Sequence, residues 1–267
     1  MRDSMSESLL PTINAIRYVA PLREGGSVPA IVEADDDGTY VLKFRGAGQG
    51  RKALIAELVA GEIGRALGLP VPDLALIELD GVLGRAEPDP EIKTIIDASV
   101  GLNLAVDYLP GSLGFGPLDH RKVDDDLASA IVWFDAYVTN VDRTPRNPNM
   151  LWWHRRLYLI DHGASLYFHH NWGGDDRSRS PFAAIKDHVL LRRASALETV
   201  DAAMAERLPH DTVRRIVAAI PDDWLTEETA FPDADTHRQA YADYLLRRLH
   251  GPRPFVEEAI RARAKLL

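Results

Sequence analysis

The sequence predicts an α+β protein with two lobes, a β-rich N-terminal lobe followed by a mainly helical C-terminal lobe. Between about residues 12 and 110, strand-like runs dominate and a single helical pattern lies among them. Beyond residue 120 the apolar residues recur mostly at helical spacing, with interruptions at prolines. A segment rich in glycine and proline, residues 110–119, separates the two patterns. We therefore expect one lobe over residues 1–109 and a second over residues 110–267.

The composition is that of an ordinary globular protein and excludes several classes. The 267 residues include 31 Lys and Arg against 40 Asp and Glu, a formal charge of −9, and no cysteine. Without cysteine there are no disulfide bonds and no thiolate ligands. The acidic balance argues against direct nucleic-acid binding, which needs basic surface. No apolar run approaches the roughly 18 residues of a membrane span, and the first residues lack the order of a secretory signal. We expect a cytoplasmic protein that does not bind membranes.

The N-terminal pattern predicts a β-hairpin followed by a helix. The runs 28–33 and 39–44 flank an Asp/Gly turn signal, which is typical of a hairpin. The second run, YVLKF, places Lys43 in an apolar strand, where a charged group needs a partner. After a glycine-rich break, apolar residues at helical spacing predict a helix over residues 52–68. Two further strand-like runs follow, at residues 73–79 and 102–108.

The predicted helix carries two carboxylates that can pair with Lys43. At 100° per residue, Glu62 falls within the apolar arc of the helix, whereas Glu57 lies outside it. A residue that pairs with a buried lysine has to face inward. Periodicity therefore favours Glu62 over Glu57.

The most informative segment, residues 139–168, combines two acids with two amides. Asp142 lies in a polar loop after an apolar helix, and Asn147 and Asn149 follow it by five and seven residues. A short hairpin, with strands at residues 150–153 and 157–160, then delivers Asp161 in the sequence IDHG. In phosphoryl transfer one carboxylate accepts the hydroxyl proton, while an amide and a second carboxylate hold magnesium. The segment matches these requirements.

Taken in order, these motifs resemble the HipA-like branch of the protein-kinase-like superfamily. YVLKF resembles the strand with the nucleotide-binding lysine, ELVAGEIGRALGLPVP resembles the family's helix, and TNVDRTPRNPN resembles its catalytic loop. IDHG stands where protein kinases have D-F-G. The resemblance covers residues 17–168, and residues 169–200 more loosely. It is closest to short members that lack the N-terminal subdomain of the toxin kinase, and it implies a bilobal protein-kinase-like fold.

The resemblance assigns a role to each of these side chains. Asp142 is implied as the general base or hydroxyl-orienting group, Asp161 as the principal magnesium ligand and Lys43 as the phosphate-binding lysine. The family spacing to Gly68 selects Glu57 as the partner of the lysine, and we prefer Glu57 to Glu62 on that spacing.

The second metal ligand is left open between two amides. Asn147 keeps the family's five-residue offset from Asp142. Asn149 is instead followed by Met150 and Leu151, as in the family's continuation into the hairpin. We keep both as metal-ligand candidates and lean to Asn147.

Two further segments are implied in nucleotide binding. In the loop before the first hairpin strand, Gly25 and Gly26 would let backbone N–H groups approach phosphates, as in nucleotide-covering loops. Ser27 is a candidate autophosphorylation site, because some HipA-type kinases modify a serine in this loop. The connector between the lobes is expected to contact adenine through its backbone amides, and it comprises Val106, Asp107, Tyr108 and Leu109.

The resemblance implies an ATP- and Mg²⁺-dependent kinase whose acceptor is a Ser or Thr hydroxyl on a protein. A small-molecule kinase is the first alternative, although such relatives usually have H-G-D where this chain has N-V-D. A nucleotide-binding pseudokinase or scaffold is the second, because DHG replaces D-F-G. Nucleotidyl transfer from an inverted nucleotide is the third.

Overall fold

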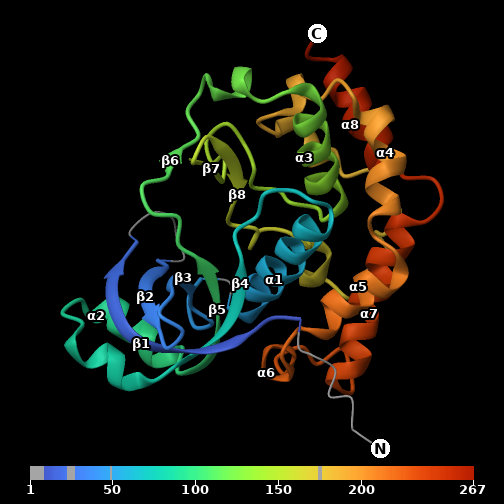
Figure 1. Cartoon of the computed structure of the whole chain (residues 1–267). Helices are drawn as coiled ribbons and strands as arrows, with labels where there is room; N and C mark the ends of the chain where they lie inside the picture. Colours follow the sequence, from blue (N-terminus) through green and yellow to red (C-terminus); the bar gives the residue numbers. More distant parts are fainter. Residues whose placement is uncertain (1–8, 23–27, 49, 174–175) are drawn as a thin grey trace, which may run out of the picture.

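A computed structural model describes residues 9–22, 28–48, 50–173 and 176–267 (Figure 1). Five strands of the N-terminal lobe close into a barrel in the order β1-β2-β3-β5-β4. Only one of the pairings is parallel, that between β1 and β4, and it closes the barrel. The strands are β1 (Thr12–Pro21), β2 (Ala30–Ala34), β3 (Thr39–Lys43), β4 (Leu74–Leu79) and β5 (Gly101–Asp107).

The predicted hairpin forms strands β2 and β3, with Ile31 opposite Val41. Because side chains alternate along a strand, Leu42 points into the barrel and Lys43 points to the other face. Leu42 is fully buried among the apolar residues of the barrel interior. The alternation therefore decides that the lysine leaves the barrel toward the rest of the molecule.

The prediction of a single helix in the N-terminal lobe is wrong. A second helix, α2 (Pro90–Ala98), packs Ile92 and Ile96 into the barrel core. It begins with a proline, and Asp89 caps it by accepting a hydrogen bond from the backbone N–H of Glu91 (3.0 Å). Ile92, Ile95 and Ile96 recur at helical spacing, but the run is short and its proline-rich start, EPDP, is typical of a loop. A short 3₁₀ segment, η1 (Gly81–Ala86), precedes it.

Helix α1 (Arg51–Ala66) lies between the barrel and the helices of the C-terminal lobe (Figure 1). All of its residues from Leu54 to Gly61 are buried. The helix packs closely against Leu74 and Val71 because residues 61 and 64 are glycines. A Cβ at Gly61 would come within 2.8 Å of Leu74, and one at Gly64 within 2.9 Å of Val71. The helix therefore belongs to both lobes by packing, and its apolar residues join one core with Phe134 and its neighbours.

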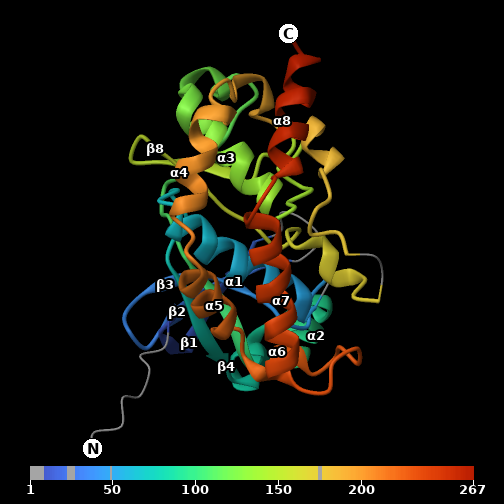
Figure 2. The same ribbon diagram turned by 90° about the vertical axis from the view of Figure 1, so that its right-hand side faces the viewer.

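The C-terminal lobe combines six α-helices with a small sheet in the part of the chain that the structure describes. The helices are α3 (Asp125–Tyr137), α4 (Leu197–Glu206), α5 (His210–Ala218), α6 (Asp222–Leu225), α7 (Ala234–Leu249) and α8 (Pro254–Ala264). The sheet consists of β6 (Leu113–Gly114), β7 (Met150–Trp153) and β8 (Arg156–Leu159). Four short 3₁₀ segments join these elements, η2 (Asp119–Lys122), η3 (Tyr167–His170), η4 (Ala183–Asp187) and η5 (Leu191–Arg193). Figure 2 shows α5 and α7 in front of α1, with α8 above α7.

The predicted acidic start of α3 is observed. Asp124 is its N-cap and accepts a hydrogen bond from the backbone N–H of Leu127 (2.8 Å). The helix is then buried over most of its length and carries Trp133, Phe134 and Tyr137 into the shared core. Because α3 ends just before the loop that contains Asp142, this core fixes the start of that loop. Among the described residues, no helix is both long enough and apolar enough to span a bilayer.

The shared core can be tested at Ile63, which is 0% exposed in α1. We expect Ile63→Ala to lower the free energy of unfolding by about 2–5 kcal/mol, because it leaves a cavity that this packing cannot refill. Urea denaturation measures the change. The control Ile16→Ala, at a side chain that is 55% exposed on β1, should change it by less than about 0.5 kcal/mol. Equal losses at both positions would contradict the account of the core.

Candidate active site

The side chain of Lys43 joins the two lobes. Its Nζ lies 2.8 Å from Oδ1 of Asp161 and 3.7 Å from Oε2 of Glu57. Lys43 ends strand β3, Glu57 belongs to α1, and Asp161 follows β8, 118 residues further along the chain than the lysine. The lysine and the glutamate are largely removed from solvent. The structure thus brings together three side chains that the sequence singles out.

Burial and charge oppose each other at these groups. Burial alone would lower the pKa of Lys43, but Glu57 and Asp161 outweigh it and hold this pKa above its ordinary value. Burial raises the pKa of Glu57, and Lys43 offsets this only in part. Burial also acts to raise the pKa of Asp161, but the ammonium beside it holds that pKa below its ordinary value. The lysine is therefore a cation, and Asp161 is its ionised partner.

The structure places Glu57, and not Glu62, beside the lysine. Glu62 pairs instead with Arg65 on its own helix (3.2 Å). The periodicity argument for Glu62 is wrong because α1 is buried on nearly every side, so an apolar arc does not mark its inner face. The glutamate selected by the family spacing is the one that faces Lys43.

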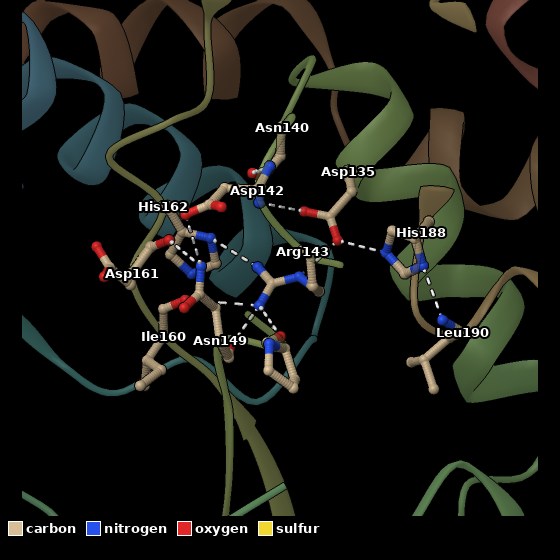
Figure 3. A network of polar contacts seen from close by, with 11 residues as sticks. Asp135, Asn140, Asp142, Arg143, Asn149, Ile160, Asp161, His162, His188 and Leu190 are labelled. Atoms are coloured by element: carbon tan, nitrogen blue, oxygen red, sulfur yellow. Dashed lines mark hydrogen bonds and ion pairs between the residues drawn. The ribbon is translucent and has the colours of Figure 1, made fainter. Parts of the chain in front are cut away.

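The loop after α3 holds Asp142 in a network of short polar contacts (Figure 3). Its backbone N–H donates to Oδ1 of Asn140 (3.0 Å). Its carboxylate Oδ2 accepts from Nδ2 of Asn147 (2.7 Å) and more distantly from Nδ2 of Asn149 (3.4 Å). The loop is closed on itself, since the backbone N–H groups of Thr144 and Asn147 each donate to the carbonyl of the other (3.1 Å).

The two candidate amides differ in their surroundings. Asn149 is 8% exposed, and its Nδ2 also lies 3.5 Å from the carbonyl oxygen of Asp161. Asn147 is exposed. Asn149 and Asp161 both adopt positive φ angles, 49° and 55°. This left-handed conformation is uncommon outside glycine, although asparagine and aspartate tolerate it best. Asn149 precedes β7 and Asp161 follows β8, so the two residues lie together at the open end of the β7–β8 hairpin.

A cleft of about 360 Å³ lies at these residues and is lined from both lobes. Lys43, Glu57 and Asp161 contribute charged groups to its lining. Val41, Leu151 and Ile160 contribute apolar surface. The amides Asn147 and Asn149 also line it. An apolar cleft that also carries a cation and carboxylates is suited to a ligand with a flat base and charged phosphates.

A second cavity, of about 580 Å³, lies on the C-terminal lobe between η3 and α7. Its lining includes Phe168, Trp172 and Tyr244, and none of the predicted nucleotide or metal residues. It is larger than the cleft at Lys43 and also carries charged residues (Asp176, Arg177, Asp243 and Arg247), but all of its lining comes from the C-terminal lobe. We therefore place the candidate active site at Lys43.

The connector between the lobes lines the cleft with all four predicted residues, Val106, Asp107, Tyr108 and Leu109. Two of its backbone amides have partners within the protein. The N–H of Asp107 donates to the carbonyl of Asp73 (2.8 Å), and the N–H of Tyr108 donates to that of Thr39 (3.0 Å). Both donors are already engaged within the protein, so neither reaches a base in this conformation.

The glycine-bearing loop is described only at its flanks. Leu22 and Pro29 line the cleft, and the N–H of Leu22 donates to the carbonyl of Pro29 (2.7 Å). Gly25, Gly26 and Ser27 lie outside the described residues.

Several buried polar residues behind the site were not predicted from the sequence. Beneath the Asp142 loop, Asp135 is ion-paired with Arg143 and hydrogen-bonded to His188. A signal was available for Asp135, which interrupts the apolar run IVWFDAY of α3, where a charge needs a partner. His162, between Asp161 and Gly163, is also buried, and its Nδ1 lies 3.2 Å from Nη2 of Arg143.

The fold is similar to that of two kinases of known structure. The structure is similar to that of the Helicobacter pylori proinflammatory kinase CtkA, with a TM-score of 0.51 and 14% identity, over 96% of this chain and 100% of that one. It is also similar to the Golgi casein kinase with Mn and ADP bound, with a TM-score of 0.51 and 13% identity, over 94% of this chain and 74% of that one. At such identities these likenesses establish the fold alone, and they confirm the predicted α+β class.

The sequence identifies the family. Residues 15–253 match the profile of the HipA-like kinases, so the chain belongs to the HipA-like kinase family. This confirms the resemblance drawn from the motifs. No curated protein matches the chain significantly by sequence.

The burial of His162 predicts a pH dependence of stability. Burial, together with the charge of Arg143, lowers the pKa of His162 to about 3. Between about pH 6.5 and this value, the unfolded chain binds a proton that the native protein excludes. The contribution of neutral His162 to the free energy of unfolding is therefore complete above about pH 6.5. It declines as the pH falls, by up to about 1.4 kcal/mol per pH unit.

The variant His162→Asn isolates this effect, because its Oδ1 keeps an acceptor for Arg143 but does not titrate. Urea unfolding at pH 7.5, 6 and 5 should show that the wild type loses stability faster than the variant. Parallel pH profiles for the two proteins would contradict a buried neutral His162.

Proposed function

We propose that this protein is an ATP- and Mg²⁺-dependent kinase that transfers the γ-phosphate of ATP to a Ser or Thr hydroxyl of an acceptor protein. The observation that carries the proposal is the convergence of Lys43, Glu57 and Asp161 on one cleft between the lobes. Membership of the HipA-like kinase family supports the same reaction class.

The residues at the cleft suit a nucleotide with a divalent ion. The carboxylate of Asp161 and the amide oxygen of Asn149 are hard oxygen donors, which Mg²⁺ prefers. Magnesium, when bound, would neutralise charge that develops on the transferring phosphate. The Golgi casein kinase, which shares the fold, binds Mn and ADP, and this supports a metal–nucleotide complex here.

Each side chain has a role in this proposal. Lys43 binds the phosphates as a cation, and Glu57 holds the lysine in place from α1. Asp142 accepts the proton of the acceptor hydroxyl, or orients that hydroxyl, from a loop fixed by Asn140 and Asn147. Catalysis then depends mainly on positioning and on fixed charges, and no covalent intermediate is needed.

The surroundings of the two amides support Asn149 as the second metal ligand and Asn147 as the residue that orients Asp142. Asn149 is buried beside Asp161, whereas Asn147 is exposed and forms hydrogen bonds to the side chains of Asp142 and Thr144. The five-residue offset favours Asn147, but the two additional residues of this loop bring Asn149 to the base of the hairpin.

The amide assignment predicts different metal dependences for two matched variants. Asn149→Ala should raise the Mg²⁺ concentration for half-maximal activity at least about tenfold, since a ligand is lost. Asn147→Ala should lower the rate at saturating Mg²⁺ without changing that concentration. Mg²⁺ titrations of initial rates measure both, and the opposite pattern would reassign the ligand to Asn147.

The proposed reaction is tested with Asp142→Asn and Asp161→Asn. Both should reduce transfer of the γ-phosphate by at least about 100-fold, since one removes the proton acceptor and the other removes a metal ligand. Asp211→Asn, at an exposed position in the first turn of α5, is the control and should retain activity.

The assay uses ATP labelled at either the γ- or the α-phosphate, with protein and small-molecule acceptors offered separately. Label transferred only from the γ-position to protein supports the proposal. Transfer only to metabolites identifies a small-molecule kinase, and transfer of the α-label identifies nucleotidyl transfer. Thermal stabilisation by nucleotide without any transfer identifies a pseudokinase or scaffold. Wild-type rates in both folded variants would exclude the assigned site.

A further inference from the structure

Arg143, the residue after Asp142, lies at the centre of a buried network (Figure 3). It is 1% exposed. Its Nε donates to Oδ2 of Asp135 (2.6 Å), its Nη1 to the carbonyl of Asn149, and its Nη2 approaches Nδ1 of His162 (3.2 Å). One guanidinium therefore contacts helix α3, the residue before β7 and the residue after Asp161. Arg143 itself follows the proposed base Asp142, and two of these contacts lie at or next to the proposed metal ligands Asn149 and Asp161.

Asp135 connects to the same loop through both of its carboxylate oxygens. Its Oδ2 binds Arg143, and its Oδ1 accepts from Nδ2 of Asn140 (2.8 Å). Asn140 in turn accepts from the backbone N–H of Asp142 through its Oδ1 (3.0 Å). Burial acts to raise the pKa of Asp135, but Arg143 and His188 outweigh it and hold this pKa below its ordinary value. Asp135 is thus a buried carboxylate with charged and polar partners on both oxygens.

His188 brings a distant segment to this network. Its Nε2 lies 2.9 Å from Oδ2 of Asp135, 53 residues away in the sequence. Its Nδ1 accepts from the backbone N–H of Leu190 (3.0 Å), so the proton of the neutral ring is on Nε2 and is donated to Asp135. The backbone N–H of Val189 also donates to the carbonyl of Arg143 (3.1 Å). Residues 188–190 therefore hold the loop through both side chain and backbone.

We propose that Asp135, Arg143 and His188 are positioning residues that hold Asp142, Asn149 and Asp161 in their reactive arrangement. This inference rests on the proposed function. None of the three lines the cleft, so they act through the residues they hold. The planar fork of arginine fixes several acceptors at once, which a flexible lysine cannot do. Because Asn149 and Asp161 sit in an uncommon backbone conformation, the network supplies contacts that keep them there.

The network is tested at its edge, because removing Arg143 would leave a buried carboxylate without its cation. In His188→Gln, the side-chain amide can still donate to Asp135. In His188→Asn, the shorter side chain can accept from Leu190 but cannot reach Asp135. We expect the Asn variant to lower kcat about tenfold and to raise the Mg²⁺ concentration for half-maximal activity severalfold. The Gln variant should stay within about threefold of wild type on both.

Two further readouts separate positioning from a general structural role. The affinity for ATP in the presence of EDTA should change less than about twofold in both variants, because Asp135, Arg143 and His188 do not line the cleft themselves. Amide hydrogen exchange should become faster in the Asn variant over residues 140–150 and 161–163, and remain unchanged elsewhere. This second readout needs no activity, so it tests the network even if the proposed kinase reaction is wrong.

Either of two results would overturn the inference. One is unchanged exchange in the Asp142 loop of the Asn variant. The other is a uniform loss in which ATP affinity, exchange protection over the whole chain and rate all change together in both variants.

Discussion

The partly buried ammonium of Lys43 is the charge on which the arrangement of this protein depends. A cation removed from water is unfavourable unless carboxylates offset its desolvation. Glu57 and Asp161 do so from opposite lobes, one from α1 and the other from the end of the β7–β8 hairpin. The three side chains therefore form a site only when barrel, helix and hairpin take their observed relative positions. Stability and the geometry of the cleft are thus linked through the same ion pairs.

Two apolar cores support this arrangement in different ways. The barrel interior, with Ile92 and Ile96 of α2, shapes β3 so that Lys43 points away from it. The larger core joins α1 to α3 and thereby fixes both Glu57 and the start of the Asp142 loop. At the C-terminal end of α3, apolar packing gives way to the buried polar group of Asp135, Arg143 and His188. Such a group is costly to bury, but its hydrogen bonds and ion pairs have a preferred geometry. They can therefore fix the conformation of an irregular loop that carries the proposed metal ligands.

Local patterns in the sequence were sufficient to predict the β2–β3 hairpin, helix α1 and the β7–β8 hairpin, because alternation, turn residues and glycines mark them. The order of motifs was also enough to identify the family. Helical periodicity failed at Glu57, since α1 is buried over most of its circumference and its apolar residues do not single out the side that faces Lys43. The pairing of Asp135 with His188 joins residues far apart in the chain, and no local pattern encodes that distance. The engagement of the Asp107 and Tyr108 amides likewise depends on tertiary contacts with Asp73 and Thr39.

A crystal structure of the protein with a nonhydrolysable ATP analogue and Mg²⁺ tests the central claim most directly. We expect the triphosphate to lie against the ammonium of Lys43, the ion to be bound by Asp161 and Asn149, and the terminal phosphate to face Asp142. A nucleotide bound outside this cleft would contradict the account. So would one inside it whose phosphates make no contact with Lys43. An inverted nucleotide, with its α-phosphate toward Asp142, would keep the site but contradict phosphoryl transfer.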